Sequence, residues 1–91
     1  MRTTQLTNDN GNKVANHYII YDSEFTAFQS YNSIIIKTVF EDGKRVVYLD
    51  SYYWNYSRTT AKYRNLYLGE TTKEIEKKIK SGVYLLTNLN N

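Results

Sequence analysis

The sequence predicts an α+β fold, in which a small, mostly antiparallel sheet of about four or five strands packs with a C-terminal two-helix hairpin and a final strand. Three observations carry this prediction. Alternating β-branched and aromatic runs fill residues 18–49, two well-capped helical segments follow, and one more apolar run closes the chain. At 91 residues the chain has room for one modest core.

The first sixteen residues differ in character from the rest of the chain. They are rich in Asn and Thr, and they lack a continuous apolar pattern around the turn pair Asn10-Gly11. We expect a flexible arm or a weak hairpin over residues 1–16, with partial disorder. A single α+β domain is then expected over residues 17–91.

Strand-like runs begin at Tyr18 and are separated by turn formers. They are Tyr18–Tyr21, Phe25–Tyr31 and Ser33–Phe40. The clearest local signal is VFEDGKRVVYL, where Asp42-Gly43 tolerates the positive φ angles of a two-residue type I′ hairpin turn. This turn predicts the cross-strand pairs Glu41–Lys44, as a salt bridge, Phe40–Arg45, Val39–Val46, Lys37–Tyr48 and Ile36–Leu49. The core face is assigned to Ile34, Ile36, Val47 and Leu49.

Helix signals follow the hairpin. Ser57 is a suitable N-cap and Gly69 a suitable C′ residue, so the first helix is predicted over 58–68. Thr71 followed by Glu74 makes a capping box, which predicts a second helix over 72–81.

The second helix is expected to carry a Glu74–Lys78 pair at i,i+4 spacing. The run VYLLTNL, residues 83–89, is predicted to be a final strand that returns to the sheet edge.

Several function classes lack their signatures. The absence of cysteine excludes disulfides and thiolate zinc sites, and no apolar segment suggests a signal peptide or a membrane span. The single histidine, His17, is expected to be a surface or strand-start residue rather than a catalytic base. Acidic pairs fall in predicted turns, and the glycines are isolated. We therefore predict no catalytic residue, no cofactor and no metal.

The stretch DSYYWNYSRTTAKYRNLYLG combines many tyrosines with cationic side chains. Its rings are expected to fill part of the core, in which we place Trp54 and Tyr63, or to form a contact surface. Alternation would send Tyr52, Trp54 and Tyr56 to one side and Tyr53 to the other. Residues 58–80 carry seven basic and three acidic side chains, a net charge of +4. The candidate partner-binding residues are Tyr52, Tyr53, Tyr56, Arg58, Lys62 and Asn65.

Four short motifs carry a resemblance to a known group of proteins. They are Ser30-Tyr31, the block from Trp54 to Lys62, Leu68-Gly69, and the approach from Lys78 to Tyr84. On these motifs the chain resembles a family of small uncharacterised bacteriophage proteins. The resemblance implies a stand-alone domain that a phage makes in the cytoplasm of the infected bacterial host, and it supplies no catalytic residue.

We accordingly expect a non-enzymatic, phage-encoded binding protein, an anti-defence (anti-CRISPR-like) or host-takeover inhibitor. Its partner would be a host protein or nucleoprotein complex, without a membrane. The alternative is a single-stranded nucleic-acid-binding protein, in which the tyrosines stack on bases while Arg58, Lys62 and Arg64 meet phosphates. A third hypothesis is a homo-oligomer that assembles through exposed strand edges. The pattern leaves the target and the oligomeric state open.

Overall fold

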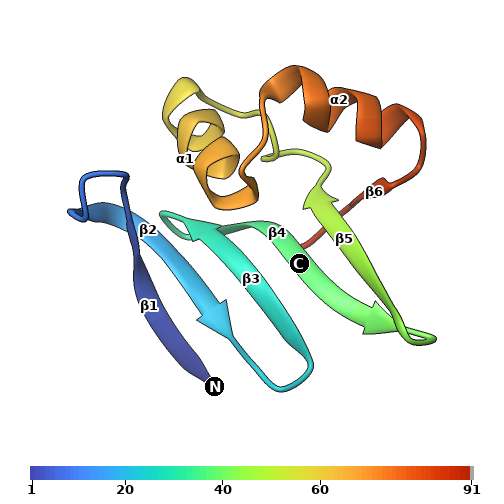
Figure 1. Ribbon diagram of the computed structural model, residues 1–91, viewed down its shortest axis with the longest axis horizontal. Helices are drawn as coiled ribbons and strands as arrows, with labels where there is room; N and C mark the ends of the chain where they lie inside the picture. Colours follow the sequence, from blue (N-terminus) through green and yellow to red (C-terminus); the bar gives the residue numbers. More distant parts are fainter. Residues whose placement is uncertain (91) are drawn as a thin grey trace.

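Six strands form one sheet in the order in which they occur along the chain. The computed structural model describes residues 1–90. The strands are β1 (Arg2–Thr7), β2 (Lys13–Tyr21), β3 (Phe25–Ser30), β4 (Ser33–Glu41), β5 (Lys44–Asp50) and β6 (Tyr84–Thr87). The first five are antiparallel neighbours, whereas β6 pairs with β5 in parallel. Helices α1 (Arg58–Leu68) and α2 (Thr72–Lys80) lie together on one side of the sheet (Figure 1). The predicted α+β class is confirmed.

The N-terminal segment forms a hairpin rather than a free arm. Strand β1 pairs with β2, which begins at Lys13 and belongs to the same sheet as the rest of the chain. Leu6 and Val14 are buried at 4% and 8% exposure. Two apolar side chains in a polar segment are therefore enough to attach it to the core.

The β4–β5 hairpin has the predicted register, from Glu41–Lys44 to Ile36–Leu49. Asp42 and Gly43 have φ angles of 53° and 78°, as a type I′ turn requires. The predicted Glu41–Lys44 salt bridge is wrong, because Glu41 Oε1 accepts a hydrogen bond of 2.9 Å from the Tyr48 hydroxyl instead. An exposed ion pair gains little free energy, so a phenol donor on the same face competes successfully.

A β-bulge changes which isoleucine enters the core. Phe28 pairs with Ile36 but Gln29 pairs with Ile34, so Ile35 is an extra residue on β4. Ile35 and Ile36 are both buried, at 1% and 0% exposure, while Ile34 is only half-buried. The assignment of Ile34 to the core was wrong because it assumed an uninterrupted alternation, which a bulge breaks.

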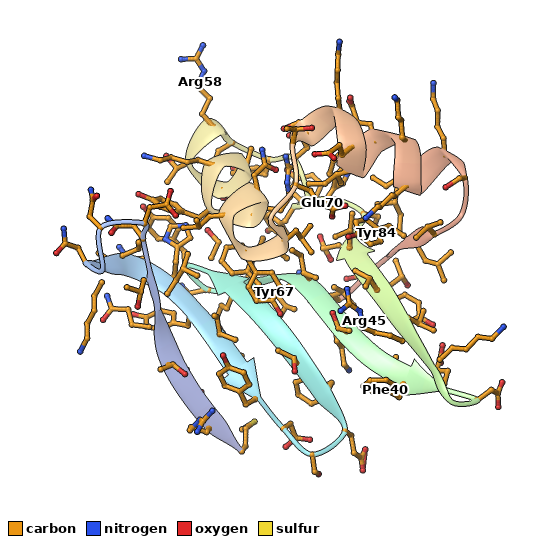
Figure 2. All side chains as sticks on the ribbon, viewed as in Figure 1. Phe40, Arg45, Arg58, Tyr67, Glu70 and Tyr84 are labelled. Carbon is orange, nitrogen blue, oxygen red and sulfur yellow. The ribbon has the colours of Figure 1, made fainter. Side chains whose placement is uncertain are left out.

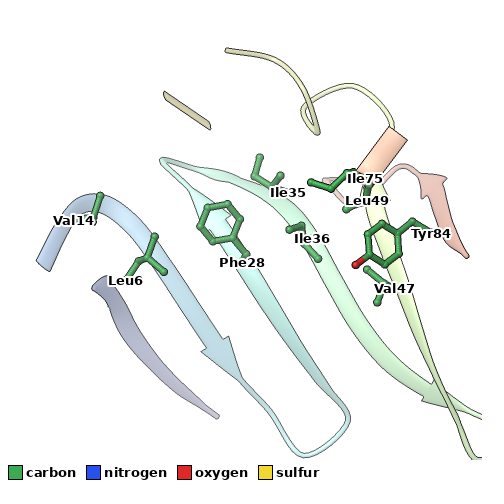
Figure 3. Close-up of a cluster of buried hydrophobic side chains, with 9 residues drawn as sticks. All are labelled: Leu6, Val14, Phe28, Ile35, Ile36, Val47, Leu49, Ile75 and Tyr84. Atoms are coloured by element: carbon green, nitrogen blue, oxygen red, sulfur yellow. The ribbon is translucent and has the colours of Figure 1, made fainter. Parts of the chain in front are cut away.

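The core lies between the sheet and the helices. Its buried members, shown in Figure 3, are Leu6, Val14, Phe28, Ile35, Ile36, Val47, Leu49, Ile75 and Tyr84. Trp54 and Tyr63 pack against this cluster but are only partly buried. Within the described residues, no helix is long and apolar enough to cross a membrane.

Both helices have the predicted caps. Ser57 accepts a hydrogen bond from the Thr60 N–H group, and Gly69 ends α1 in the left-handed region. The capping box of Thr71 and Glu74 begins α2. Since Glu74 Oε1 accepts from the Thr71 N–H group at 2.8 Å, it does not join Lys78 as expected.

Lys78 instead forms an ion pair with Glu70, which also accepts a hydrogen bond from the Tyr84 hydroxyl. Glu70, which lies just before α2, thus connects Lys78 of α2 with Tyr84 of β6. The strand β6 is held by side chains as well as by its parallel ladder with β5.

Replacing Gly43 by Val should lower the melting temperature. A β-branched residue in the left-handed region costs about 1–2 kcal/mol, out of a total stability of about 5 kcal/mol for a domain of this size. Lys44→Val is the matched control, since Lys44 is exposed and lies outside the positive-φ positions of the described residues. Equal melting temperatures for the two variants would contradict the turn assignment.

Candidate partner-binding site

Residues 51–57, here called the tyrosine loop, follow β5 as consecutive turns rather than as a strand. Tyr52, Tyr53 and Tyr56 therefore gather on one another, with ring centroids 4.7, 5.7 and 5.4 Å apart. The predicted alternation is wrong for this reason, and both Tyr53 and Trp54 pack against the core. The edge-to-face contacts hold the rings as one cluster.

Asp50 fixes the beginning of the tyrosine loop. Its carboxylate is 1% exposed and accepts hydrogen bonds from the N–H groups of Tyr52 at 3.1 Å, Tyr53 at 2.8 Å and Leu89 at 2.8 Å. Burial raises the pKa of Asp50, but the backbone hydrogen bonds outweigh burial and leave the pKa below its ordinary value. The loop is therefore anchored to a charged carboxylate.

Arg64 fixes the other part of the loop from helix α1. Its side chain is fully buried, and Nη1 donates to the Trp54 carbonyl at 2.6 Å and to Asn55 Oδ1 at 3.2 Å. Nη2 donates to Asn65 Oδ1 and to Thr72 Oγ1, both at 2.9 Å. The guanidinium also lies 5.2 Å from the centre of the Trp54 ring. One arginine thus joins the loop to α1 and α2.

This burial corrects the expectation that Arg64 meets phosphates. Burial lowers the pKa of Arg64 from its ordinary value, but the ordinary pKa of arginine lies so far above neutral pH that the side chain stays charged. Helical spacing alone did not separate it from the exposed Arg58 and Lys62, because the polar acceptors around it lie in the loop and in α2.

A small pocket opens beside the tyrosine cluster, with a volume of about 180 Å³. Its lining joins the tyrosine loop to the β3–β4 turn and consists of Ser30, Tyr31, Ser33, Ile35, Tyr53, Tyr56, Ser57 and Thr60. Pockets for drug-sized ligands or cofactors are usually about 300–1,000 Å³. This one matches a single side chain better than a cofactor.

The hydroxyl groups on the pocket wall continue into the core as a hydrogen-bonded chain. Thr60 Oγ1 lies 3.1 Å from Ser30 Oγ, which lies 3.0 Å from His17 Nε2. His17 Nδ1 lies 2.8 Å from the Ala15 carbonyl, so Nδ1 must donate and Nε2 of a neutral ring accepts from Ser30. His17 is 1% exposed, which corrects its expected place at the surface.

The contact between Ser30 and His17 is one part of a nucleophilic site. Attack on a carbonyl also needs donors for the developing oxyanion and access to the nucleophile. Ser30 is only 3% exposed, and the nearby Tyr31 N–H group already donates to the Asn16 carbonyl at 2.6 Å. The arrangement is suited to shaping a pocket floor rather than to reacting with a substrate.

The structure separates the candidate residues into two groups. Tyr52 and Tyr56 are exposed at 68% and 61%, and the half-buried Tyr53 lines the pocket with Tyr56. Arg58 begins α1 beside them, and its side chain extends away from the molecule (Figure 2).

Lys62 and Asn65 lie elsewhere, on a hollow of about 440 Å³ shared with Asp9, Glu70 and Glu74. Lys62 Nζ lies 5.2 Å from the centre of the neighbouring tyrosine ring, and Asn65 is bonded to Arg64 and Thr72. The candidate residues Arg58, Lys62 and Asn65 therefore do not form one surface, because the Asn65 side chain is occupied within the molecule.

Sequence reasoning missed the β3–β4 turn as part of the site. Tyr31 is 56% exposed and has a φ angle of 55°, which is uncommon for a bulky residue. The turn lies about twenty residues before the tyrosine loop, and no local pattern connects the two. The Ser30-Tyr31 pair was noted for the resemblance alone.

Replacing Asp50 by Asn should lower the free energy of unfolding by about 1–3 kcal/mol near pH 7. Because the pKa of Asp50 is lower in the folded chain than its unfolded value of about 3.9, its contribution is complete above that value and is lost as pH falls through the folded pKa. Urea unfolding at about pH 7 and pH 2.5 measures the change. Asp9→Asn, at an exposed position, is the control, and an equal loss at both pH values would contradict the assignment.

Arg64→Ala should lower the free energy of unfolding by about 3 kcal/mol or more, since it removes a fully buried side chain and leaves several part-buried acceptors without a donor. Arg58→Ala, at the exposed first residue of the same helix, should change it by no more than about 0.5 kcal/mol. Chemical denaturation of the two variants gives both numbers. Similar losses would show that Arg64 is not the structural arginine.

The chain belongs to a family of unknown function, DUF8033, whose model matches residues 1–82. The match includes the tyrosine loop, the pocket and both helices. No curated protein and no solved structure matches the chain.

Proposed function

We propose that this protein binds a partner protein through the tyrosine loop and its pocket, and that it carries out no chemistry of its own. The observation that carries the proposal is the group of exposed tyrosines, Tyr31, Tyr52 and Tyr56, at a pocket that fits one side chain. Tyrosine is enriched among the residues that dominate binding energy, because its ring supplies apolar area and its hydroxyl a hydrogen bond. If one side chain of the partner enters the pocket, the adjacent residues of the partner would contact the exposed tyrosine rings.

The cations favour a protein over a single-stranded nucleic acid. Of the three considered for phosphate contacts, Arg64 is buried and Lys62 lies among the carboxylates of Asp9, Glu70 and Glu74. Arg58 remains beside the tyrosines. Single-strand binding usually combines stacking rings with a positive groove that follows the backbone, and one arginine supplies little of such a groove.

The biological setting of the proposal comes from the sequence. The resemblance of the four short motifs to small bacteriophage proteins supports a protein made during infection, which acts in the cytoplasm of the bacterial host. Its partner is then a host protein or nucleoprotein complex, and the outcome of binding is inhibition of host defence or takeover of host machinery.

Affinity capture with the tagged protein in host cells tests the surface. The double variant Tyr52→Ser/Tyr56→Ser removes two exposed rings, and should reduce the amount of the main captured protein about ten-fold or more. Phe40→Ser is the matched control, because Phe40 is 74% exposed and lies at the β4–β5 hairpin (Figure 2). Equal capture by the double variant and the wild type would remove the tyrosine loop from the proposal.

A binding assay with a single-stranded oligonucleotide distinguishes the proposed protein partner from the nucleic-acid alternative. We expect no measurable binding of a single-stranded oligonucleotide at about 50 mM salt. A single-stranded nucleic-acid-binding protein would instead show an affinity that falls with salt, with a logarithmic slope of about −0.7 for each neutralised phosphate. If the protein shows such a slope and the Tyr52→Ser/Tyr56→Ser variant does not, the partner is a nucleic acid rather than a protein.

A further inference from the structure

The face of the sheet opposite the helices carries a set of apolar side chains that no helix covers among the described residues. Leu89, which follows β6, borders this face and lines a hollow with Lys37, Val39 and Tyr48. The apolar residues that the strand register places on this face are Ile20, Phe25, Val39, Val46, Tyr48 and Leu85, and polar Thr3, Gln5, Lys44 and Thr87 lie around them. None of them belongs to the core cluster or packs against it. Contiguous apolar surface of this kind usually marks an interaction site.

Two opposite charges lie in one row on this face. Lys37, Val39 and Glu41 are alternate residues of β4 and therefore point to the same side. Lys37 and Glu41 are four residues apart, about 13 Å along the strand, which is too far for a direct contact within the row. Neither forms an ion pair within residues 1–90. Lys37 Nζ lies 4.7 Å from the centre of the Phe25 ring, and Glu41 accepts the hydrogen bond from Tyr48. Hollows of about 320 and 490 Å³ both border these three residues.

We propose that a second copy of this chain covers the open face. The row is symmetric about Val39, with a positive charge two residues before it and a negative charge two residues after it. In this dimer the two sheets stack face to face, and the two-fold axis runs between them, perpendicular to β4 and level with Val39. The two β4 strands are then antiparallel. Each Lys37 then lies opposite Glu41 of the other copy, and each Val39 meets its equivalent.

The other arrangements of the same row are less favourable. A two-fold axis parallel to β4 would place Lys37 opposite Lys37 and Glu41 opposite Glu41, so that like charges repel. Without these charges, the face would not favour one orientation of the two copies over the other. The pairing of opposite charges therefore selects one dimer.

The available area fits a reversible dimer. Six strands spaced about 4.8 Å apart, with about six residues of 3.3 Å each, give a face of roughly 500 Å². Two copies would bury about 1,000 Å², which is near the lower limit for specific interfaces. We therefore expect the monomer and the dimer to exchange with concentration.

Sedimentation equilibrium of the purified full chain, over a range of concentrations, tests the dimer. Lys37→Glu and Glu41→Lys each place like charges opposite one another, and each variant alone should dimerise at least about ten-fold more weakly than the wild type. A mixture of the two variants should form a one-to-one heterodimer of wild-type strength, because every contact is then between opposite charges. Far-UV circular dichroism confirms that each variant is folded before mixing.

Two outcomes would overturn the proposal. One is a wild type that stays monomeric up to about 1 mM, which would leave this face to a different protein. The other is a mixture that remains as weak as its components. Val39→Asp should abolish the dimer, whereas Phe40→Asp, one residue later on the opposite face, should not. The variant Tyr52→Ser/Tyr56→Ser should dimerise like the wild type, so the two proposals fail separately.

Discussion

The burial of one guanidinium group constrains much of the structure around the site. Arg64 carries five N–H donors and a permanent charge, so its place beneath the surface requires acceptors from several directions. The loop supplies the Trp54 carbonyl and Asn55, α1 supplies Asn65, and α2 supplies Thr72. These segments cannot move apart without leaving a buried charge unpaired. The tyrosine cluster is therefore held in place before any partner arrives, which lowers the entropy that binding must lose.

The proposed binding surfaces lie on opposite sides of the molecule. The tyrosine loop precedes the helical layer, whereas the Lys37–Glu41 row lies on the other face of the sheet. A dimer formed through the row would keep both tyrosine loops accessible. Two linked sites raise the effective concentration of the second contact once the first has formed, so a repeated or multimeric target would be held more tightly than a single one.

Local signals predicted much of the fold. The Asp42-Gly43 turn determined the β4–β5 register, and Ser57 with Gly69 determined both ends of α1, because each depends on neighbours within a few residues. The features that were missed depend on distant parts of the chain. The β-bulge at Ile35 is defined against β3, and the burial of Arg64 is defined by acceptors in three segments. The candidate site combines both kinds: its tyrosines were visible in the sequence, but its pocket was not.

The contact between Arg64 and the indole ring of Trp54 has a practical consequence. The chain contains one tryptophan, so its intrinsic emission comes largely from the point where the loop meets the two helices. Circular dichroism in the far ultraviolet, in contrast, follows the sheet and the helices together. If the loop opens while the sheet persists, the two optical signals will change at different denaturant concentrations, and if the domain unfolds as one unit they will coincide. The fluorescence of Trp54 is thus an intrinsic probe of unfolding cooperativity, and it is located next to the proposed partner-binding site.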